Sequence, residues 1–177
     1  MGFPSVTDLN GLDPDVFVEE VAPLFEGAPA FLARLAAARP FSSDAAFFED
    51  ALEVARSMPE ADQLELLTAH SRIGADPADV SSPSFEEQGY DAPPDDDAER
   101  VAAELAMLNE IYEAHFGFRF VIFVAGRPRA SIIPLLEAAM RNDRTAELRR
   151  GIDDVIDIAA DRLGRWRDSD EQLPEGA

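Results

Sequence analysis

The feature that most constrains this chain is a long segment near its C-terminus in which apolar residues recur at steps of three and four. Over residues 143–166 this spacing predicts an amphipathic helix with one inward face. The residues on that face are Leu148, Ile152, Val155, Ala159, Arg162 and Trp166. One of them, Arg162, is charged, and a buried guanidinium requires a partner.

Helical spacing recurs through most of the chain, in segments bounded by proline, serine or glycine. The predicted helices cover about residues 13–24, 29–39, 42–58, 60–69, 95–116, 131–141 and 143–166. Residues 118–124 differ, because a β-branched and aromatic run between glycines predicts a short strand or a buried extended segment. The pattern as a whole indicates a mostly helical fold.

A length of 177 residues, 46% of them hydrophobic, suits one compact domain with a sizeable core. We expect residues 1–168 to form this domain and residues 169–177 to form a polar tail. The absence of cysteine excludes disulfides, thiol catalysis and thiolate metal sites. The sequence shows neither a signal-peptide pattern nor an apolar run of membrane-spanning length, so we expect a cytoplasmic protein.

The formal net charge is −21, and every basic residue is an arginine. Such a surface repels nucleic acid and anionic membranes, so neither is an expected partner. Abundant aspartate without lysine fits either a GC-rich genome or a salty cytoplasm. An anionic ligand would need a nearby arginine or a protonated histidine to offset the overall charge.

His70 ends the predicted helix over residues 60–69 and shares the inward face of Leu66 and Leu67. Histidine titrates near neutral pH and often serves as a general acid or base. The alternative is a core histidine whose ring binds a backbone carbonyl. The core histidine is the default for a lone histidine, and the polar segment that follows shifts the balance only modestly toward a functional role.

Residues 71–95 contain four prolines and four serines without helical spacing, which predicts an irregular loop of the kind that is often functional. Glu87 and Gln88 lie side by side in it. A carboxylate beside an imidazole raises its basicity and fixes its tautomer, and an amide can bind a polar ligand. Spacing alone favours the alternative that Glu87 and Gln88 are two solvated loop residues, and Ser84 could equally be a turn or cap residue.

Two further features each have a structural and a functional interpretation. Arg162 predicts either an internal ion pair or a clamp for a substrate carboxylate or carbonyl. The backbone of residues 120–124 predicts either a core strand or a row of N–H and C=O groups for a heterocycle. Two histidines without cysteine argue against a transition-metal site.

Taken together, these motifs resemble the family of 2-oxo-4-hydroxy-4-carboxy-5-ureidoimidazoline (OHCU) decarboxylases of the urate-to-allantoin pathway. The resemblance implies an all-α, single-domain bundle of about seven to nine helices, usually a homodimer, without a cofactor. It replaces the strand over residues 118–124 by an extended stretch or part of a helix. The matching motifs are Arg39-Pro40-Phe41-Ser42, the His70 segment, Ser84-x-x-Glu87-Gln88, Leu108-Asn109-x-x-Tyr112-x-x-x-Phe116-Gly117-Phe118-x-Phe120-Val121, Glu147-Leu148 and Arg162-Leu163.

The resemblance also implies a site and a reaction. The family's catalytic histidine, catalytic glutamate and active-site arginine match His70, Glu87 and Arg162. The implied reaction is decarboxylation of OHCU to (S)-allantoin, with His70 as the acid–base group oriented by Glu87. The implied substrate-binding residues are Ser71, Ser84, Gln88, Phe120, Val121, Ile122, Phe123 and Val124.

Three positions depart from the family pattern. Ser71 stands where proline is common, Arg119 replaces the proline of Phe-Gly-Phe-Pro, and Gly89-Tyr90-Asp91 replaces a run of small residues. Because these positions border the expected pocket, two alternatives follow. One is a catalytically silent or substrate-shifted helical binding protein on the same scaffold, and the other is a purely structural dimeric domain.

Overall fold

The computed structural model describes residues 3–90 and 97–171. These residues form nine α-helices and no strand, which confirms the predicted all-α fold and lies at the top of the predicted range of helices. The α-helices are α1 (Val6–Gly11), α2 (Pro14–Val21), α3 (Pro29–Ala37), α4 (Asp44–Ser57), α5 (Glu60–Ala69), α6 (Ser82–Glu87), α7 (Ala98–Phe116), α8 (Ile133–Ala139) and α9 (Arg144–Glu171). The 3-10 turns are η1 (Ala22–Leu24), η2 (Pro77–Asp79) and η3 (Arg129–Ile132).

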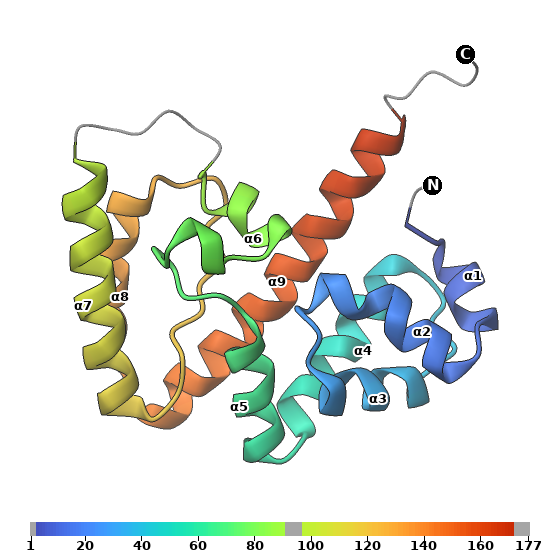
Figure 1. Ribbon diagram of the computed structural model, residues 1–177. Helices are drawn as coiled ribbons and strands as arrows, with labels where there is room; N and C mark the ends of the chain where they lie inside the picture. The colour runs from blue at the N-terminus through green and yellow to red at the C-terminus, as the bar shows by residue number, and fades with distance from the viewer. Residues whose placement is uncertain (1–2, 91–96, 172–177) are drawn as a thin grey trace.

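Helix α9 runs diagonally between two groups of helices, with α1–α4 on one side and α7 and α8 on the other (Figure 1). Its 28 residues span about 42 Å at 1.5 Å per residue. The predicted inward face is buried from Leu148 to Arg162, and Trp166 is partly buried. The helix continues to Glu171, so part of the expected tail is helical, and residues 172–177 lie outside the described residues.

Aromatic side chains pack on both sides of α9. On the α1–α4 side, the rings of Phe25 and Phe31 lie 4.8 Å apart between centroids, and those of Phe41 and Phe47 lie 5.1 Å apart. On the other side, Tyr112 of α7 contacts the rings of Phe116 and Phe120. Aromatic pairs of this kind bury large apolar areas, so both groups are anchored to one core.

Two short helices, α1 and α6, were not predicted from the sequence. Helix α1 begins with a capping box in which Ser5 and Asp8 each bind the other's backbone N–H. Helix α6 lies in the segment expected to be irregular, where the Ser81 hydroxyl accepts a hydrogen bond from the Ser84 N–H and Pro83 occupies the first turn. Six residues are too few to show helical spacing, so only cap residues could have revealed either helix.

The start expected for the helix that became α7 lies partly outside the described residues, which exclude Asp95 and Asp96. Asp97 takes the N-cap position and Gly117, with a φ of 79°, ends the helix. Residues 118–124 form neither a strand nor part of a helix, so those two alternatives are wrong, and the remaining one, an extended segment, is the one that the structure has. The aromatic and β-branched run buries side chains against α7 without a neighbouring strand.

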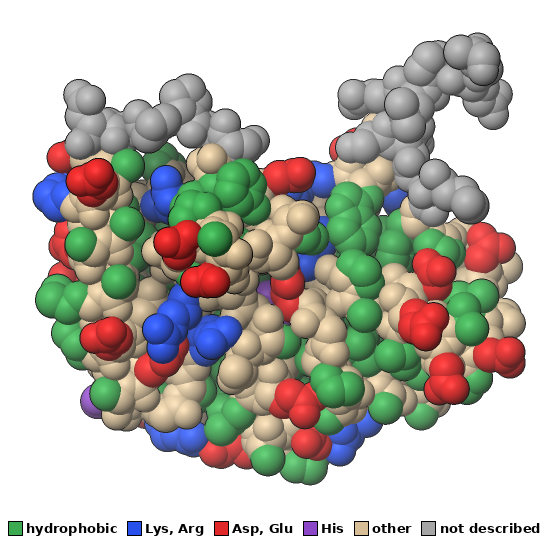
Figure 2. Space-filling view, viewed as in Figure 1, with side chains coloured by type: hydrophobic (Ala, Val, Ile, Leu, Met, Phe, Trp, Pro, Cys, Tyr) green, Lys and Arg blue, Asp and Glu red, His purple; other side chains and the backbone are tan. Residues whose placement is uncertain are grey.

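The described surface is strongly acidic, as expected from the net charge. Figure 2 shows Asp and Glu side chains spread across the face in view rather than gathered into one patch. Within residues 3–90 and 97–171, no helix has the combination of length and apolar character needed to cross a bilayer.

Substitution of Gly74 tests how the fold supports the segment after His70. Its φ is 75°, and a Cβ atom there would lie 2.9 Å from Leu105 Cδ1. We expect Gly74→Ala to lower the free energy of unfolding by about 1–3 kcal/mol, because it adds backbone strain and a clash. Urea denaturation measures this change. Gly164→Ala on α9 is the control, since its Cβ meets open space and helix propensity favours alanine; equal losses in both variants would contradict the expectation.

Candidate functional site

A cavity of about 270 Å³ lies where the segment after α5, helix α6, the extended segment and α9 meet. Every residue expected at the site lines this cavity except Arg162. Ile158, Asp161 and Arg165 of α9 join the wall, although the sequence did not single them out. The lining residues are His70, Ser71, Ile73, Ser84, Glu86, Glu87, Gln88, Phe120, Val121, Ile122, Phe123, Val124, Ala125, Gly126, Ile158, Asp161 and Arg165.

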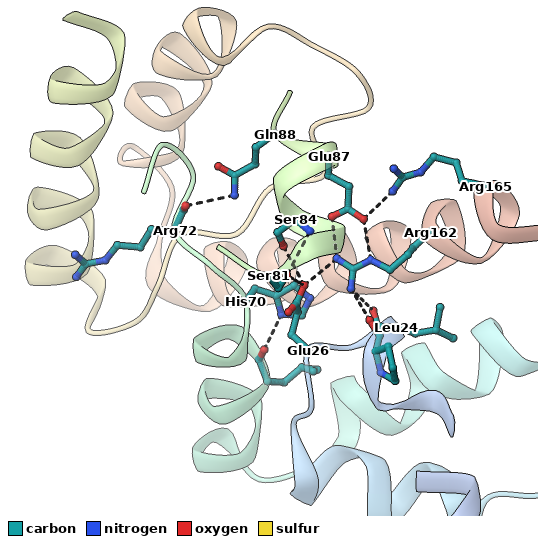
Figure 3. Close-up of polar contacts among 12 residues, drawn as sticks. Leu24, Glu26, His70, Arg72, Ser81, Ser84, Glu87, Gln88, Arg162 and Arg165 are labelled. Atoms are coloured by element: carbon teal, nitrogen blue, oxygen red, sulfur yellow. Dashed lines mark hydrogen bonds and ion pairs between the residues drawn. The ribbon is translucent and has the colours of Figure 1, made fainter. Parts of the chain in front are cut away.

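His70 stands at the C-terminal end of α5 and is 3% exposed. Its Nδ1 lies 3.1 Å from the carbonyl oxygen of Leu66 (Figure 3). Because a carbonyl only accepts, we assign the proton to Nδ1, which leaves a lone pair on Nε2. Nε2 is buried and has no hydrogen-bond partner among the described residues, so it is the ring nitrogen available to a ligand in the cavity.

Burial lowers the pKa of His70, because it penalises the charged imidazolium. The bond to Leu66 and the charges of Glu26 and Glu87 act in the opposite direction, whereas Arg162 lowers the pKa further. The resting imidazole is therefore neutral near pH 7 and can accept a proton at Nε2. The sequence predicted Glu87 as the group that fixes the tautomer, but the Leu66 carbonyl does so, and Glu87 acts on His70 only through its charge.

Arg162 is fully buried and binds Glu87 through two parallel hydrogen bonds of 2.7 and 2.8 Å (Figure 3). Its other N–H groups donate to the carbonyls of Pro23 at 2.6 Å and Leu24 at 3.3 Å, and to Glu26 at 3.0 Å. All five N–H donors of the guanidinium thus have protein acceptors. This geometry matches the ion-pair interpretation of Arg162, whose direct contact with a substrate would require one of these bonds to open.

Glu87 also forms an ion pair with a second arginine, Arg165, which lies in the wall of the cavity. Arg165, one turn beyond Arg162 on α9, donates to Glu87 Oε1 at 2.7 Å and also pairs with Asp161 at 3.0 Å. Glu87 is the last residue of α6, so its carboxylate is held from both the interior and the cavity side. The carboxylate keeps one orientation because two arginines on a single helix bind it.

Gln88 and Ser84 line the cavity but also bind other parts of the chain. Gln88 Oε1 accepts from the Gly74 N–H at 2.9 Å, and its amide nitrogen lies 3.4 Å from the Arg72 carbonyl. Ser84 Oγ donates to Glu26 Oε1 at 2.9 Å. Glu26 was missed from the sequence, where the only signal is an acidic residue after the apolar pair Leu24-Phe25 and before a glycine.

The extended segment of residues 120–124 is held at the cavity by arginine side chains. Arg150 of α9 donates to the Val121 carbonyl at 3.0 Å, and Arg127 donates to the carbonyls of Phe123 and Val124. Arg150 in turn pairs with Glu147 and Asp154. These bonds replace the ladder that a strand would have, so the backbone can form one wall of the cavity without a sheet.

Behind this wall lies a network of buried polar side chains that was not predicted from the sequence. Tyr112 donates its hydroxyl proton to Glu147 at 2.7 Å, and Asn142 binds the other carboxylate oxygen at 2.8 Å. Burial and the neighbouring Glu147 raise the pKa of Tyr112, which keeps the phenol protonated. Glu147, Arg150 and Asp154 follow each other at steps of three and four on α9, a spacing that could have indicated the network.

Comparison with known proteins identifies the family. The family model described as OHCU decarboxylase matches residues 10–164. The chain belongs to the OHCU decarboxylase family. This confirms the family expected from the sequence motifs, whose function is decarboxylation in urate degradation.

The relatives include proteins of about this length and longer proteins of which this chain matches one part. The chain is 30% identical over 162 residues to an OHCU decarboxylase of Halalkalicoccus jeotgali, covering 90% of this chain and 89% of that protein. It is 29% identical over 159 residues to the uric acid degradation bifunctional protein PucL of Bacillus subtilis, covering 90% of this chain. The match spans only 32% of PucL, so this chain is similar to one part of that longer protein.

The fold is similar to that of an OHCU decarboxylase crystallised in the presence of (S)-allantoin. The TM-score is 0.66 at 24% identity, covering 83% of this chain and 96% of the other. A solved (S)-allantoin synthase gives a TM-score of 0.63 at 17% identity, covering 92% of this chain and 54% of that one. Both likenesses concern the arrangement of the helices.

Arg119, a departure from the family pattern, has a clear structural partner in this OHCU decarboxylase family member. Its Nη1 donates to the carbonyls of Thr68, at 2.6 Å, and His70. Arg119 thereby ties the start of the extended segment to the end of α5. Ser71, the neighbouring departure, lines the cavity directly after His70.

Among the described residues, no three His, Asp or Glu side chains are grouped as the ligands of a metal ion would be.

Asp154 provides a test of the network behind the extended segment. Burial is the main cause that raises its pKa to about 6, so between about pH 4 and pH 6 the folded state binds more protons than the unfolded state. The contribution of Asp154 to stability therefore falls as pH rises through this window. We expect the unfolding free energy of the wild type, minus that of Asp154→Asn, to fall by about 2–3 kcal/mol from pH 4 to pH 7. Denaturant titrations of both proteins measure it, and a difference that stays constant with pH would refute the expectation.

Proposed function

We propose that this chain catalyses decarboxylation of OHCU to (S)-allantoin through its own side chains, without a cofactor. The observation that carries the proposal is the unpaired Nε2 of His70, buried on the wall of a cavity that Glu87 also lines. A buried neutral imidazole that faces a cavity is suited to move a proton between two positions of one small molecule. The family to which the chain belongs supports the choice of substrate.

The chemistry of the substrate defines what the site must do. OHCU carries a carboxylate and a hydroxyl on C4, next to the C5=N imine. When CO2 leaves, the electron pair of the broken bond forms a C4=C5 double bond, and the imine electrons move to nitrogen, which takes up a proton that comes from solvent water. Protonation of C5 and loss of the C4 hydroxyl proton then give allantoin.

In this mechanism His70 is the acid–base group. Nε2 accepts the proton of the C4 hydroxyl, and the resulting imidazolium delivers a proton to one face of C5. The charge of Glu87 stabilises that imidazolium, since it raises the pKa of His70. Arg162 serves the reaction by holding Glu87 in place.

The remaining lining residues bind the ring and the ureido group. The backbone of residues 120–124 and the side chains of Ser71, Ser84 and Gln88 are the polar edges offered to the ligand. Positioning of this kind favours loss of the carboxylate from one face, because it restricts the substrate to one orientation.

His70→Asn tests the proton transfer. We expect kcat to fall by about 10²- to 10⁴-fold, since general acid–base catalysis contributes on that order. The assay incubates freshly generated OHCU with the purified chain and follows its decay by circular dichroism, against the spontaneous rate. Wild-type acceleration with formation of (S)-allantoin supports the proposal. Racemic allantoin, or an active His70→Asn variant with unchanged helicity, would defeat it.

Glu87→Gln is expected to lower both activity and stability. The substitution removes the charge that faces His70 and leaves Arg162 buried with a weakened partner. Breaking one side of a buried ion pair typically costs about 3–5 kcal/mol. Thermal unfolding and kcat should therefore both change, whereas Asp153→Asn is a control that weakens the half-exposed pair with Arg56 and should cost below about 1 kcal/mol. A stable Glu87→Gln protein with full activity would contradict both roles.

The expected homodimer and cytoplasmic location remain predictions. Light scattering on the purified chain at micromolar concentration tests the first, and we expect a molar mass twice that of one chain. The OHCU decay assay together with calorimetric titration of (S)-allantoin distinguishes the catalytically silent alternative, because a silent scaffold would bind (S)-allantoin without accelerating the decay of OHCU.

A further inference from the structure

Glu26 stands out because its backbone conformation is unfavourable for its residue type. Its φ is 55°, in the left-handed region that glycine prefers, and Gly27 follows at 93°. A non-glycine residue in this region carries a cost that the surrounding structure must offset, and such residues concentrate at functional sites. The turn that Glu26 occupies joins η1 to α3 and directs the carboxylate toward α6 and α9 (Figure 3).

One oxygen of Glu26 receives three donors from two other elements. Oε1 accepts from Ser81 Oγ at 2.7 Å, Ser84 Oγ at 2.9 Å and Arg162 Nη2 at 3.0 Å. An oxygen bound by three donors can only accept. The hydroxyl protons of both serines are therefore directed to Glu26.

The two serines differ in what they face. Ser84 lines the cavity, whereas Ser81 does not line it and instead caps α6. A hydroxyl has one proton to donate and two lone pairs with which to accept. Because the Ser84 proton is used by Glu26, the hydrogen bonds that Ser84 offers toward the cavity are those of an acceptor.

We propose that Glu26 is a positioning residue that fixes the direction of the Ser84 hydroxyl, so that Ser84 recognises an N–H group of the ligand. The inference rests on the proposed function for the identity of the ligand, since OHCU and allantoin both carry ureido N–H groups. It explains why a carboxylate outside the cavity is held in a strained backbone conformation. It also makes Ser84 selective against ligands that present a carbonyl oxygen at that position, because two acceptors would face each other.

The test is a double-mutant cycle read by binding of (S)-allantoin, measured by calorimetry. Glu26→Ala and Ser84→Ala are each expected to raise the Kd by about 2- to 10-fold, the equivalent of one hydrogen bond. The double variant should bind no more weakly than the weaker single variant, because Glu26 acts through Ser84. Glu26→Gln should recover most of the affinity, since the amide oxygen still accepts.

Ser81→Ala is the matched control, because it removes a donor to the same Glu26 oxygen without altering the cavity wall. We expect its Kd for (S)-allantoin to stay within twofold of the wild-type value, even if loss of the cap lowers the melting temperature. Additive effects of Glu26→Ala and Ser84→Ala would overturn the inference, and so would a Ser81→Ala effect as large as that of Ser84→Ala. Should Glu26→Ala not fold, Glu26→Met takes its place in the cycle, because it also removes the acceptor of the Ser84 proton.

The outcome separates this inference from the proposed function. Binding of (S)-allantoin with the expected cycle, but without decay of OHCU above the spontaneous rate, would support the role of Glu26 and refute the decarboxylase activity. Decarboxylation with additive effects on Kd would do the reverse. For an active enzyme, we also expect Glu26→Ala to raise KM more than it lowers kcat, because the interaction is made with the bound ligand before and during the reaction.

Discussion

The buried guanidinium of Arg162 is the interaction on which the candidate site depends. A charge taken out of water is tolerated only if its hydrogen bonds are satisfied, and here the acceptors come from segments that are 75 and up to 139 residues away in sequence. The turn after η1, the end of α6 and the middle of α9 must therefore meet at one point. The same arrangement orients Glu87 and Glu26 toward His70 and Ser84, so the stability of the core and the geometry of the cavity are coupled.

The local charge balance at the cavity differs from that of the whole protein. The chain carries a net charge of −21, but the carboxylates of Glu26 and Glu87 are paired with Arg162 and Arg165. This pairing leaves His70 in an environment where burial has the largest effect on its pKa. A neutral base can therefore exist beside two carboxylates, which would otherwise hold the imidazole in its charged form.

Helical spacing was sufficient to predict the seven longer helical segments, because each buries a stripe of apolar side chains. It failed for α1 and α6, whose six residues show no period and whose signals are cap residues. Propensity left a strand and a buried extended segment open for residues 118–124, since an aromatic and β-branched run suits both, and the structure has the second, with carbonyls that bind arginines. Of the eleven site residues that the family resemblance implied, ten line the cavity, and Arg162 is the exception.

The remaining features of the site depend on tertiary contacts that a single sequence does not display. Which acceptor fixes the tautomer of His70 follows from the bend at the end of α5, where Leu66 is four residues away. Which acceptors Arg162 meets in the core depends on the position of the turn at Glu26. Neither has a local pattern, because each depends on where a distant segment lies in the folded chain.

The extended segment that forms one wall of the cavity is anchored by individual guanidinium groups instead of a strand neighbour. In a sheet, moving one carbonyl disturbs a whole row of cooperative bonds. Here Arg150 and Arg127 each hold separate carbonyls, from opposite ends of the segment. Divergence among relatives can thus reshape the pocket one anchor at a time, through replacements remote from the ligand, and alter which small molecules are accepted while the helical scaffold persists.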